Sequence, residues 1–162
     1  MKVLNIHKRE INQPKNEIVA LFKTLASAND LMIATDKWPP MKLDKGLQVG
    51  SKGGHGPIKY HVIDYKWDES ILFKFDLKGF DGTHKFNILE TDQNRTEISH
   101  TIEMVTSGSA TFKWIFTIRW LHDAYIEDAF DKVENHFVTS KKTTAWSLWV
   151  RILRKIMKPK KK

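Results

Sequence analysis

The chain has 162 residues, a length that fits one domain and lets it bury roughly 68–70% of the surface of its unfolded form. It contains no cysteine, which excludes disulfides and thiolate zinc sites, so any metal would need histidine and carboxylate ligands. The first residues lack the apolar run of a signal peptide, and no stretch is apolar for long enough to span a bilayer. We therefore expect a cytoplasmic protein.

The net charge of +8 is concentrated at the C-terminus. Residues 141–162 contain nine lysines and arginines and no acidic residue, whereas residues 1–140 contain 18 basic and 19 acidic residues. A nearly neutral body offers no extended basic stripe, so we expect no specific binding to nucleic acid. The composition divides the chain into a predicted domain at 1–140 and a basic, amphipathic segment at 141–162.

The first third of the chain predicts one strand followed by two short helices. Residues 3–11 have the alternation of a strand, and Pro14 suits the first position of a helix because apolar residues follow it at helical spacing. Ser27 with Asp30 three residues later resembles a helix cap. A second short helix is therefore predicted, and it must end before Trp38, which two prolines follow.

After residue 45 the pattern changes to strands separated by glycines, which favours an antiparallel meander. Gly53 to Gly56 is interpreted as a turn. The predicted strands are residues 47–52, 58–67, 70–77, 81–90 and 95–104. The side chains that should face one shared interior are Ile71, Phe73 and Phe75, then His84, Phe86 and Ile88, then Ile98, His100, Ile102 and Met104.

The register of the last two strands can be predicted from parity, because a shift of one residue turns every side chain to the other face. A three-residue loop at 92–94 puts the apolar faces of the strands 81–90 and 95–104 on the same side of the sheet. It pairs Phe86 with His100 and His84 with Ile102. On the strand 58–67 the less polar of the two faces is expected to point inward. That face consists of His61, Ile63, Tyr65 and Trp67.

Residues 110–138 form the longest helical pattern, about 40 Å at 1.5 Å per residue, enough to cross a sheet of these strands. One side of this helix is apolar and includes Trp114, Ile118, Leu121 and Tyr125. The opposite side carries an acidic stripe, expected to be solvated, of Asp123, Glu127, Asp131 and Glu134.

This order of elements resembles the SRPBCC superfamily of START-like helix-grip proteins. The resemblance extends to the Trp38-Pro39-Pro40-Met41 segment, the glycine-rich GGHGPIKYHVIDY turn and strand, the GFDGTHKF segment and the TIRWLHDAYIEDAF helix. It implies an α+β helix-grip fold, in which a curved antiparallel sheet of six to seven strands surrounds a long C-terminal helix and encloses a cavity. Family members include lipid carriers, hormone-binding proteins and polyketide cyclases or dehydratases. No motif transfers catalytic residues to this chain.

The predicted ligand-binding residues are those expected to face the cavity. Three histidines among them are each interpreted as hydrogen-bonded core residues or as groups that orient a ligand. A metal site would require His61, His84 and His100 to converge on one point, so we expect neither a metal nor a cofactor. The candidates are Trp38, His61, Ile63, Tyr65, Phe73, Phe75, His84, Phe86, His100, Ile102, Trp114, Ile118 and Leu121.

Residues 145–157 predict a strongly amphipathic helix with tryptophans on one side and cations on the other. Such a helix, too short to span a bilayer, is typical of an interfacial membrane anchor. The alternative of equal weight is that its apolar side packs on its own sheet or on a partner subunit. The predicted membrane-contact residues are Trp146, Trp149, Arg151, Leu153, Arg154 and Lys155.

Together these patterns favour a protein that binds or transfers a small hydrophobic or lipid-like ligand, with the tail in peripheral contact with an anionic membrane surface on the cytoplasmic side. The rival hypothesis is an enzyme of the polyketide cyclase or dehydratase type that uses the same cavity. A third is a basic adaptor whose tail binds acidic partners. The sequence leaves self-association open.

Overall fold

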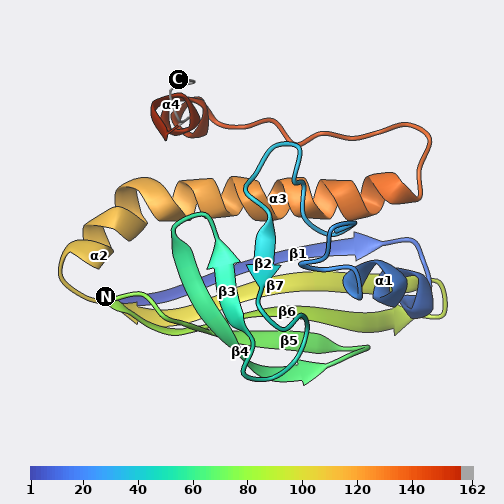
Figure 1. Ribbon diagram of the computed structural model, residues 1–162. Coiled ribbons are helices and arrows are strands. Elements are labelled where there is room, and N and C mark those ends of the chain that lie inside the picture. Colours follow the sequence, from blue (N-terminus) through green and yellow to red (C-terminus); the bar gives the residue numbers. More distant parts are fainter. Residues whose placement is uncertain (158–162) are drawn as a thin grey trace.

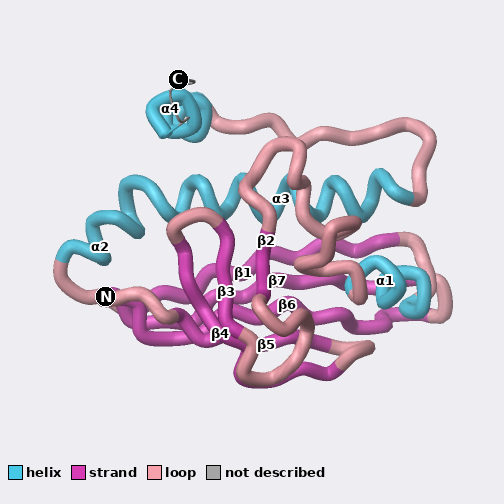
Figure 2. Tube along the Cα trace, in the orientation of Figure 1, coloured by secondary structure: helices cyan, strands magenta, loops and turns pink. Residues whose placement is uncertain are grey.

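A seven-stranded antiparallel sheet forms one layer of the structure, and a long helical segment crosses its inner face as the second layer (Figures 1 and 2). The computed structural model describes residues 1–157. Within that range the sheet order is β1-β7-β6-β5-β4-β3-β2, so the first and last long strands are neighbours. The strands are β1 (Lys2–Ile11), β2 (Met41–Leu43), β3 (Lys52–His55), β4 (Ile58–Lys66), β5 (Ser70–Phe75), β6 (Phe80–Asp92) and β7 (Arg95–Thr106).

The long segment is one continuous run of three helical pieces, and α4 lies on its far side as seen from the sheet (Figure 1). This arrangement is the predicted helix-grip fold, which the structure confirms. The helices are α1 (Lys15–Phe22), α2 (Ser109–Lys113), the π-helical turn η1 (Trp114–Ile118), α3 (Arg119–His136) and α4 (Leu148–Met157).

The predicted second short helix is absent from residues 23–40, which form turns instead. The buried Asp30 carboxylate accepts hydrogen bonds of 2.8–2.9 Å from the backbone N–H groups of Ala26, Met32 and Ile33. These bonds give the backbone N–H groups hydrogen-bond partners in a non-helical conformation. Asp30, which suggested a helix cap in the sequence, therefore stabilises a turn instead.

The predicted strand at 47–52 was wrong, and of the predicted turn at Gly53–Gly56 only Gly56 lies in the observed turn. Gly53 and Gly54 lie inside β3, where a Cβ atom would come within 1.8 and 1.9 Å of backbone oxygens on the two neighbouring strands. The glycines are therefore required by close strand packing, and the turn is made by Gly56 and Pro57.

The predicted register of β6 and β7 is confirmed, since Phe86 pairs with His100 and His84 with Ile102. The connection differs from the predicted three-residue loop. A register shift after Glu90 precedes the pairing of Asp92 with Arg95, which leaves a two-residue turn. The predicted pairing needs an odd number of residues between the paired strand ends, and the extra residue of the bulge provides it.

The inward face predicted for β4 was wrong. Tyr60 and Val62 are buried, whereas His61 points outward to the Asp76 carboxylate at 2.8 Å and Ile63 is exposed. A bulge after Val62 reverses the alternation of side chains along β4. Asp64 and Lys66, which made the face of Tyr60 and Val62 look too polar to be buried, lie after the bulge and point outward. The bulge returns Tyr65 to the inner face, where it packs against Phe22, and it leaves Trp67 57% exposed.

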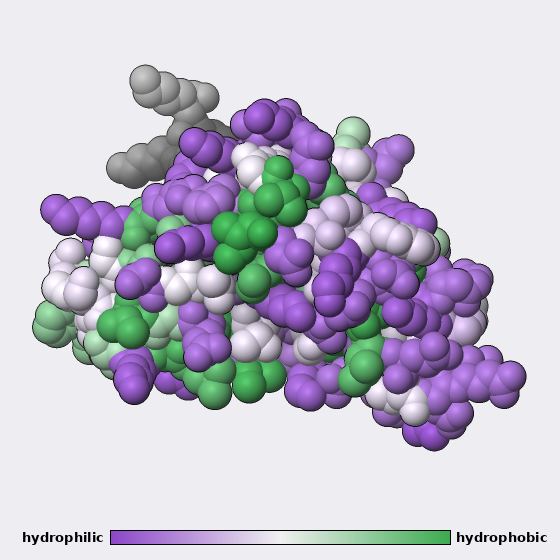
Figure 3. Space-filling view, turned by 90° about the horizontal axis from the view of Figure 1, so that it is seen from below, coloured by the Kyte–Doolittle hydropathy of each residue, from purple (hydrophilic) through white to green (hydrophobic). Residues whose placement is uncertain are grey.

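Two apolar clusters fix the helical segment to the sheet at its two ends. The first joins α1, the turns after it and the last turns of α3 to β4–β7, and the second joins the start of the segment to β1, β6 and β7. From the segment, the first includes Tyr125, Ile126, Ala129, Phe130 and Val133, and the second Ala110 and Trp114. The outer face of the sheet is mainly hydrophilic with small hydrophobic patches (Figure 3).

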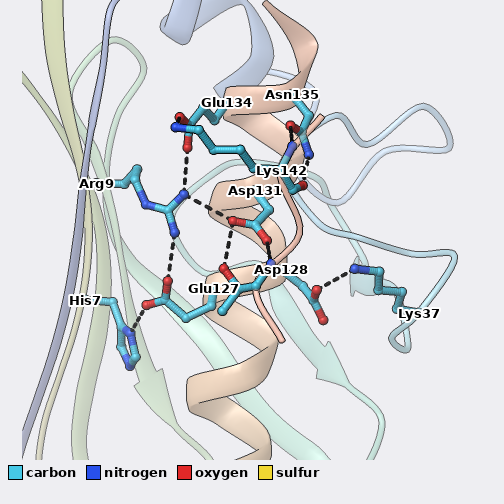
Figure 4. A network of polar contacts seen from close by, with 10 residues as sticks. His7, Arg9, Lys37, Glu127, Asp128, Asp131, Glu134, Asn135 and Lys142 are labelled. Carbon is cyan, nitrogen blue, oxygen red and sulfur yellow. Dashed lines mark hydrogen bonds and ion pairs between the residues drawn. The ribbon is translucent and has the colours of Figure 1, made fainter. Parts of the chain in front are cut away.

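The acidic stripe of α3 is not solvated as predicted but faces β1, whose inward positions carry His7 and Arg9 (Figure 4). The Arg9 guanidinium binds the carboxylates of Glu127 at 2.8 Å, Asp131 at 3.1 Å and Glu134 at 2.8 Å. Charge-assisted hydrogen bonds of this kind are stronger than neutral ones. They fix the edge strand along one side of the helix.

A second polar centre is the buried Asp128 carboxylate, which three distant side chains contact. Lys37 Nζ lies 2.5 Å away, and the indole Nε1 atoms of Trp38 and Trp146 each donate a hydrogen bond of 2.7 Å. Asp128 thus holds the loop before β2 and the segment before α4 against the same turn of α3.

We predict that Arg9→Ala lowers the free energy of unfolding by about 2–4 kcal/mol, because it leaves three carboxylates facing one another. The loss should be smaller than for a fully buried ion pair, since the Arg9 side chain is 22% exposed and water screens part of the interaction. The control is Arg95→Ala, which removes exposed ion pairs to Glu10 and Asp92 and should cost less than about 1 kcal/mol. Urea denaturation measures both. Equal losses in the two variants would contradict the role given to Arg9.

Candidate ligand cavity

A cavity of about 260 Å³ lies between the helical segment and the inner face of the sheet, in the gap between the two apolar clusters. Its walls come from β5–β7 below, η1 and α3 above, and the Trp38–Met41 and β3–β4 segments at the side. Arg154 and Met157 of α4 complete it. The other lining residues are Trp38, Pro39, Met41, His55, Gly56, Pro57, Ile58, Phe75, Phe80, His84, Phe86, His100, Ile102, Trp114, Thr117, Ile118, Leu121, His122, Tyr125 and Ile126.

The π-helical turn η1 forms part of the roof of this cavity. Its residues Trp114, Thr117 and Ile118 all line the space, followed by Leu121 and His122 at the start of α3. A π turn is rare and is frequent at functional sites, because the wider turn changes which side chains share a face.

Two histidines from neighbouring strands meet on the cavity floor. His84 Nδ1 and His100 Nε2 are 3.2 Å apart, a hydrogen bond in which one ring donates to the other. His84 also stacks on Phe73 and Phe75, with ring centroids 4.6 and 4.9 Å apart. The second nitrogen of each imidazole has no partner among the described residues. The floor is therefore aromatic, with a few unused polar atoms.

A second polar group occupies the side wall. The His55 ring stacks on Tyr125 with centroids 4.8 Å apart, and its Nδ1 lies 3.0 Å from the Tyr60 hydroxyl. Burial raises the pKa of Tyr125, so its phenol remains protonated. The Tyr125 oxygen is buried and lacks a hydrogen-bond partner within the described residues.

The histidines of the cavity are neutral at physiological pH. Burial lowers the pKa of His55 to about 4 and lowers the pKa values of His84 and His100 well below the ordinary value. Burial is also the largest influence on His122, whose pKa is lowered although Asp123 opposes the shift. A neutral imidazole can donate one hydrogen bond and accept another, so it can orient a hydroxyl or a carbonyl.

Arg154 is the one permanently charged side chain among the described residues that line the cavity. Its guanidinium lies over the Trp38 ring at 4.3 Å and donates to the Lys37 carbonyl, while its buried Nε has no partner in the described part of the chain. This places one cation at the side of the cavity that α4 covers.

The tail helix docks on its own domain with only part of its apolar side. Val150 and Leu153 are buried, and the Trp149 indole donates to the Phe116 carbonyl at 3.0 Å. The adjoining part of the apolar side stays exposed, through Leu148, Trp149, Ile152 and Ile156. No helix in residues 1–157 is long and apolar enough to cross a membrane. The lysines at 158 and 160–162 lie outside the described residues.

The structure divides the predicted membrane-contact residues into two groups. Leu153 and Arg154 are engaged by the protein itself, and Trp146 packs on Trp38 with ring centroids 5.4 Å apart. The other three remain accessible, namely Trp149, Arg151 and Lys155.

Nine of the thirteen predicted ligand-binding residues lie on the cavity. Phe73 is inward as predicted but sits behind His84 and is fully buried. The other three lie elsewhere: His61 and Ile63 point outward from β4, and Tyr65 is on the inner face but packs near α1. The nine are Trp38, Phe75, His84, Phe86, His100, Ile102, Trp114, Ile118 and Leu121.

Sequence reasoning missed five polar residues of the cavity, among them Thr117 and Arg154, the second of which was assigned to the membrane instead. Tyr125 was placed on the inner side of the helix but not assigned to the site, and its helical spacing from Ile118 and Leu121 was the available signal. His122 follows Leu121 directly and faces the cavity beside it. His55 had been placed in a turn, so no sequence signal indicated its contact with Tyr125.

Solved structures share the fold at low sequence identity. A norcoclaurine synthase from Thalictrum flavum, solved in complex with dopamine and hydroxybenzaldehyde, is 13% identical over 86% of this chain and 90% of that chain, with a TM-score of 0.63. A protein from Nitrosospira multiformis is 12% identical over 85% and 97% of the two chains, with a TM-score of 0.65. A conserved protein of unknown function from Enterococcus faecalis is 11% identical over 96% of this chain and 84% of that chain, with a TM-score of 0.62.

No family model and no curated protein matches the sequence. The likeness to solved structures establishes the helix-grip fold, and at these identities it establishes the fold alone.

We predict that stability falls as the pH is lowered from about 6.5 towards 4, because the unfolded state protonates His55 over this range while the folded state does not. His55→Gln should show a shallower loss, with a difference of roughly 1–2 kcal/mol, since His55 keeps some solvent exposure at the cavity rim. Urea denaturation at pH 7, 6 and 5 measures the slopes. Identical slopes in the two proteins would show that His55 is not held neutral.

Proposed function

We propose that this protein binds a small apolar molecule in the cavity between the sheet and the helical segment. The observation that carries the proposal is a partly open cavity, lined mainly by aromatic and aliphatic side chains, whose few neutral histidines and one tyrosine have polar atoms without a hydrogen-bond partner among residues 1–157. Ligand pockets have this composition, because apolar walls supply affinity and the few polar groups fix orientation.

The cavity volume limits the size of the ligand. An engineered apolar cavity of about 150 Å³ accommodates benzene. At about 260 Å³ this cavity suits a molecule of one or two rings, or one short acyl chain, and is too small for a two-chain lipid. The structural neighbour solved with dopamine and hydroxybenzaldehyde binds aromatic molecules of this size class.

The polar groups favour a ligand with one polar end. The Arg154 guanidinium, on the side that α4 covers, would pair with a carboxylate or another anionic group. The imidazoles of His84 and His100, on the cavity floor, would contact a hydroxyl or a carbonyl of the ligand.

We further propose that α4 covers the cavity and contacts an anionic membrane surface. Its exposed apolar side chains lie beside Arg151 and Lys155 on the helix, a combination typical of interfacial helices. The same helix lines the cavity from its docked side. Contact with a membrane would therefore act on the element that closes the ligand site, as transfer of a ligand requires.

A catalytic function in the same cavity is the second candidate. It is favoured by Tyr125, His84 and His100, which line the cavity, keep polar atoms without a hydrogen-bond partner among the described residues, and can donate or accept protons. Chemical conversion of a bound cyclic or polyketide-like compound by the purified protein would support this candidate over binding alone.

To test ligand binding, we predict that Leu121→Trp weakens the binding of 2-naphthoate at least about tenfold, because the larger ring fills the cavity that Leu121 lines. The matched control is Leu89→Trp, since Leu89 is 53% exposed on the outer face of the sheet. Titration calorimetry measures the affinity. Equal affinity in all three proteins would place the naphthoate outside this cavity, and no binding by the unmodified chain would contradict a site for apolar acids of this size.

To test membrane contact, we predict that the double variant Trp149→Ser, Ile156→Ser loses most of its sedimentation with vesicles of phosphatidylcholine and phosphatidylserine, because it removes two exposed apolar side chains of α4. Leu89→Ser removes an exposed apolar side chain from the sheet and should sediment like the unmodified protein. If the double variant also pellets normally, α4 is not the contact.

A further inference from the structure

A cluster of nitrogen and oxygen ligands lies between β1 and the start of α3, beside the cavity, with His122 as the one member that also lines it. His7 contributes from the inner face of β1, and His122 and Asp123 are consecutive residues of α3. One potential ligand atom from each of the three lies within 4.8 Å of those of the other two.

The spacing of these atoms matches a metal site. His7 Nε2 and Asp123 Oδ1 are hydrogen bonded at 3.1 Å, and the same oxygen lies 3.6 Å from His122 Nδ1, so an ion would replace the His7–Asp123 hydrogen bond. Ligands bound to zinc at 2.0–2.1 Å are separated from one another by roughly 3.0–3.4 Å in tetrahedral or octahedral geometry. All three atoms lie within 4.8 Å of one another, so the side chains would need to draw together to reach bonding distance of one ion.

The surrounding residues orient two of the three ligands as they are oriented in metalloproteins. His7 Nδ1 is 2.8 Å from the Glu127 carboxylate, which leaves Nε2 directed at Asp123, and Arg9 holds Glu127 in turn. Asn5 Nδ2 donates to Asp123 Oδ1 at 2.9 Å. A carboxylate behind a ligating histidine fixes its tautomer and ring orientation.

His122 gives an independent indication that a ligand belongs here. Its side chain is 9% exposed, and neither ring nitrogen has a hydrogen-bond partner in the described residues. A buried imidazole with two unsatisfied nitrogens is costly and uncommon in a native structure. Coordination of an ion by one of these nitrogens would remove part of that cost.

The site also has an access route. Asp123 and Glu127 line a second hollow of about 200 Å³ between α3 and the segment 144–150. On the other side, the His122 ring lines the main cavity. An ion at this position would therefore be reached from the hollow and would lie at the wall of the cavity.

We propose that His7, His122 and Asp123 bind one divalent transition-metal ion of the zinc class. Two imidazoles and one carboxylate suit Zn²⁺, Co²⁺ or Fe²⁺ and do not suit Ca²⁺ or Mg²⁺, which prefer oxygen ligands. The proposal does not rest on the function proposed above, because metal binding is measured without an organic ligand.

The test uses the full chain without a histidine tag, dialysed against EDTA and then against chelator-free buffer. Titration calorimetry with ZnCl₂ should show one ion per chain. His122→Phe, which keeps an aromatic ring in the cavity wall, and Asp123→Asn should each weaken binding at least about 100-fold, and Glu127→Gln about 10–100-fold. His61→Gln removes an exposed histidine–carboxylate pair and should leave the affinity unchanged.

Two further readouts separate loss of a ligand from loss of the fold. Zn²⁺ should raise the melting temperature of the unmodified protein and of His61→Gln, but not that of His122→Phe. Bound Co²⁺ should give the visible spectrum of a nitrogen-ligated ion of low coordination number, absent in Asp123→Asn. No binding up to about 1 mM Zn²⁺, which corresponds to about 4 kcal/mol, would overturn the proposal. Unchanged affinity in a folded His122→Phe or Asp123→Asn, or loss of binding in His61→Gln, would also overturn it.

Discussion

The contact between the edge strand and the long helix governs the rest of this structure. Arg9 on β1 binds three carboxylates of α3, so the helix is held along one side by charge-assisted hydrogen bonds. Apolar packing fixes its two ends, with Val133 and Phe130 in one cluster and Trp114 in the other. Because the supports lie at the ends and along one edge, the middle of the helical segment need not mesh with the sheet, and the cavity lies there.

The same arrangement explains why the cavity is apolar yet contains polar atoms. The strands beneath it place His84 and His100 among aromatic rings, where burial keeps both imidazoles neutral. Asp128 connects the opposite side of α3 to Trp38 and Trp146, and through them to the base of α4. The cavity, its cover and the edge-strand contact thus all depend on the position of one helix.

The fold and much of the cavity could be predicted from the sequence because the relevant patterns are local. Regular alternation gave the inner faces of β5, β6 and β7, and parity gave the pairing of Phe86 with His100. Prediction failed where the chain departs from regular alternation. The bulge after Val62 reversed the face of β4, and Gly53 marked close strand packing rather than a turn.

The long-range polar contacts could not be predicted for a different reason. The acidic stripe of α3 has the periodicity of a solvated face, and only its pairing with His7 and Arg9, more than a hundred positions earlier, makes it structural. No pattern within the helix contains that information. The position of α4 was similarly open, because an amphipathic pattern does not show what the apolar side contacts. In the structure Val150 and Leu153 of that side pack on the domain and the rest is exposed.

A space able to admit a guest molecule separates the helix from the sheet. Crystals of the protein pressurised with xenon test it directly, because xenon enters enclosed apolar cavities and is located by its strong scattering. The account predicts xenon density bounded by Phe86, Ile102, Trp114 and Leu121. Crystals with no xenon there, and with the side chains of helix and sheet in continuous contact, would contradict it.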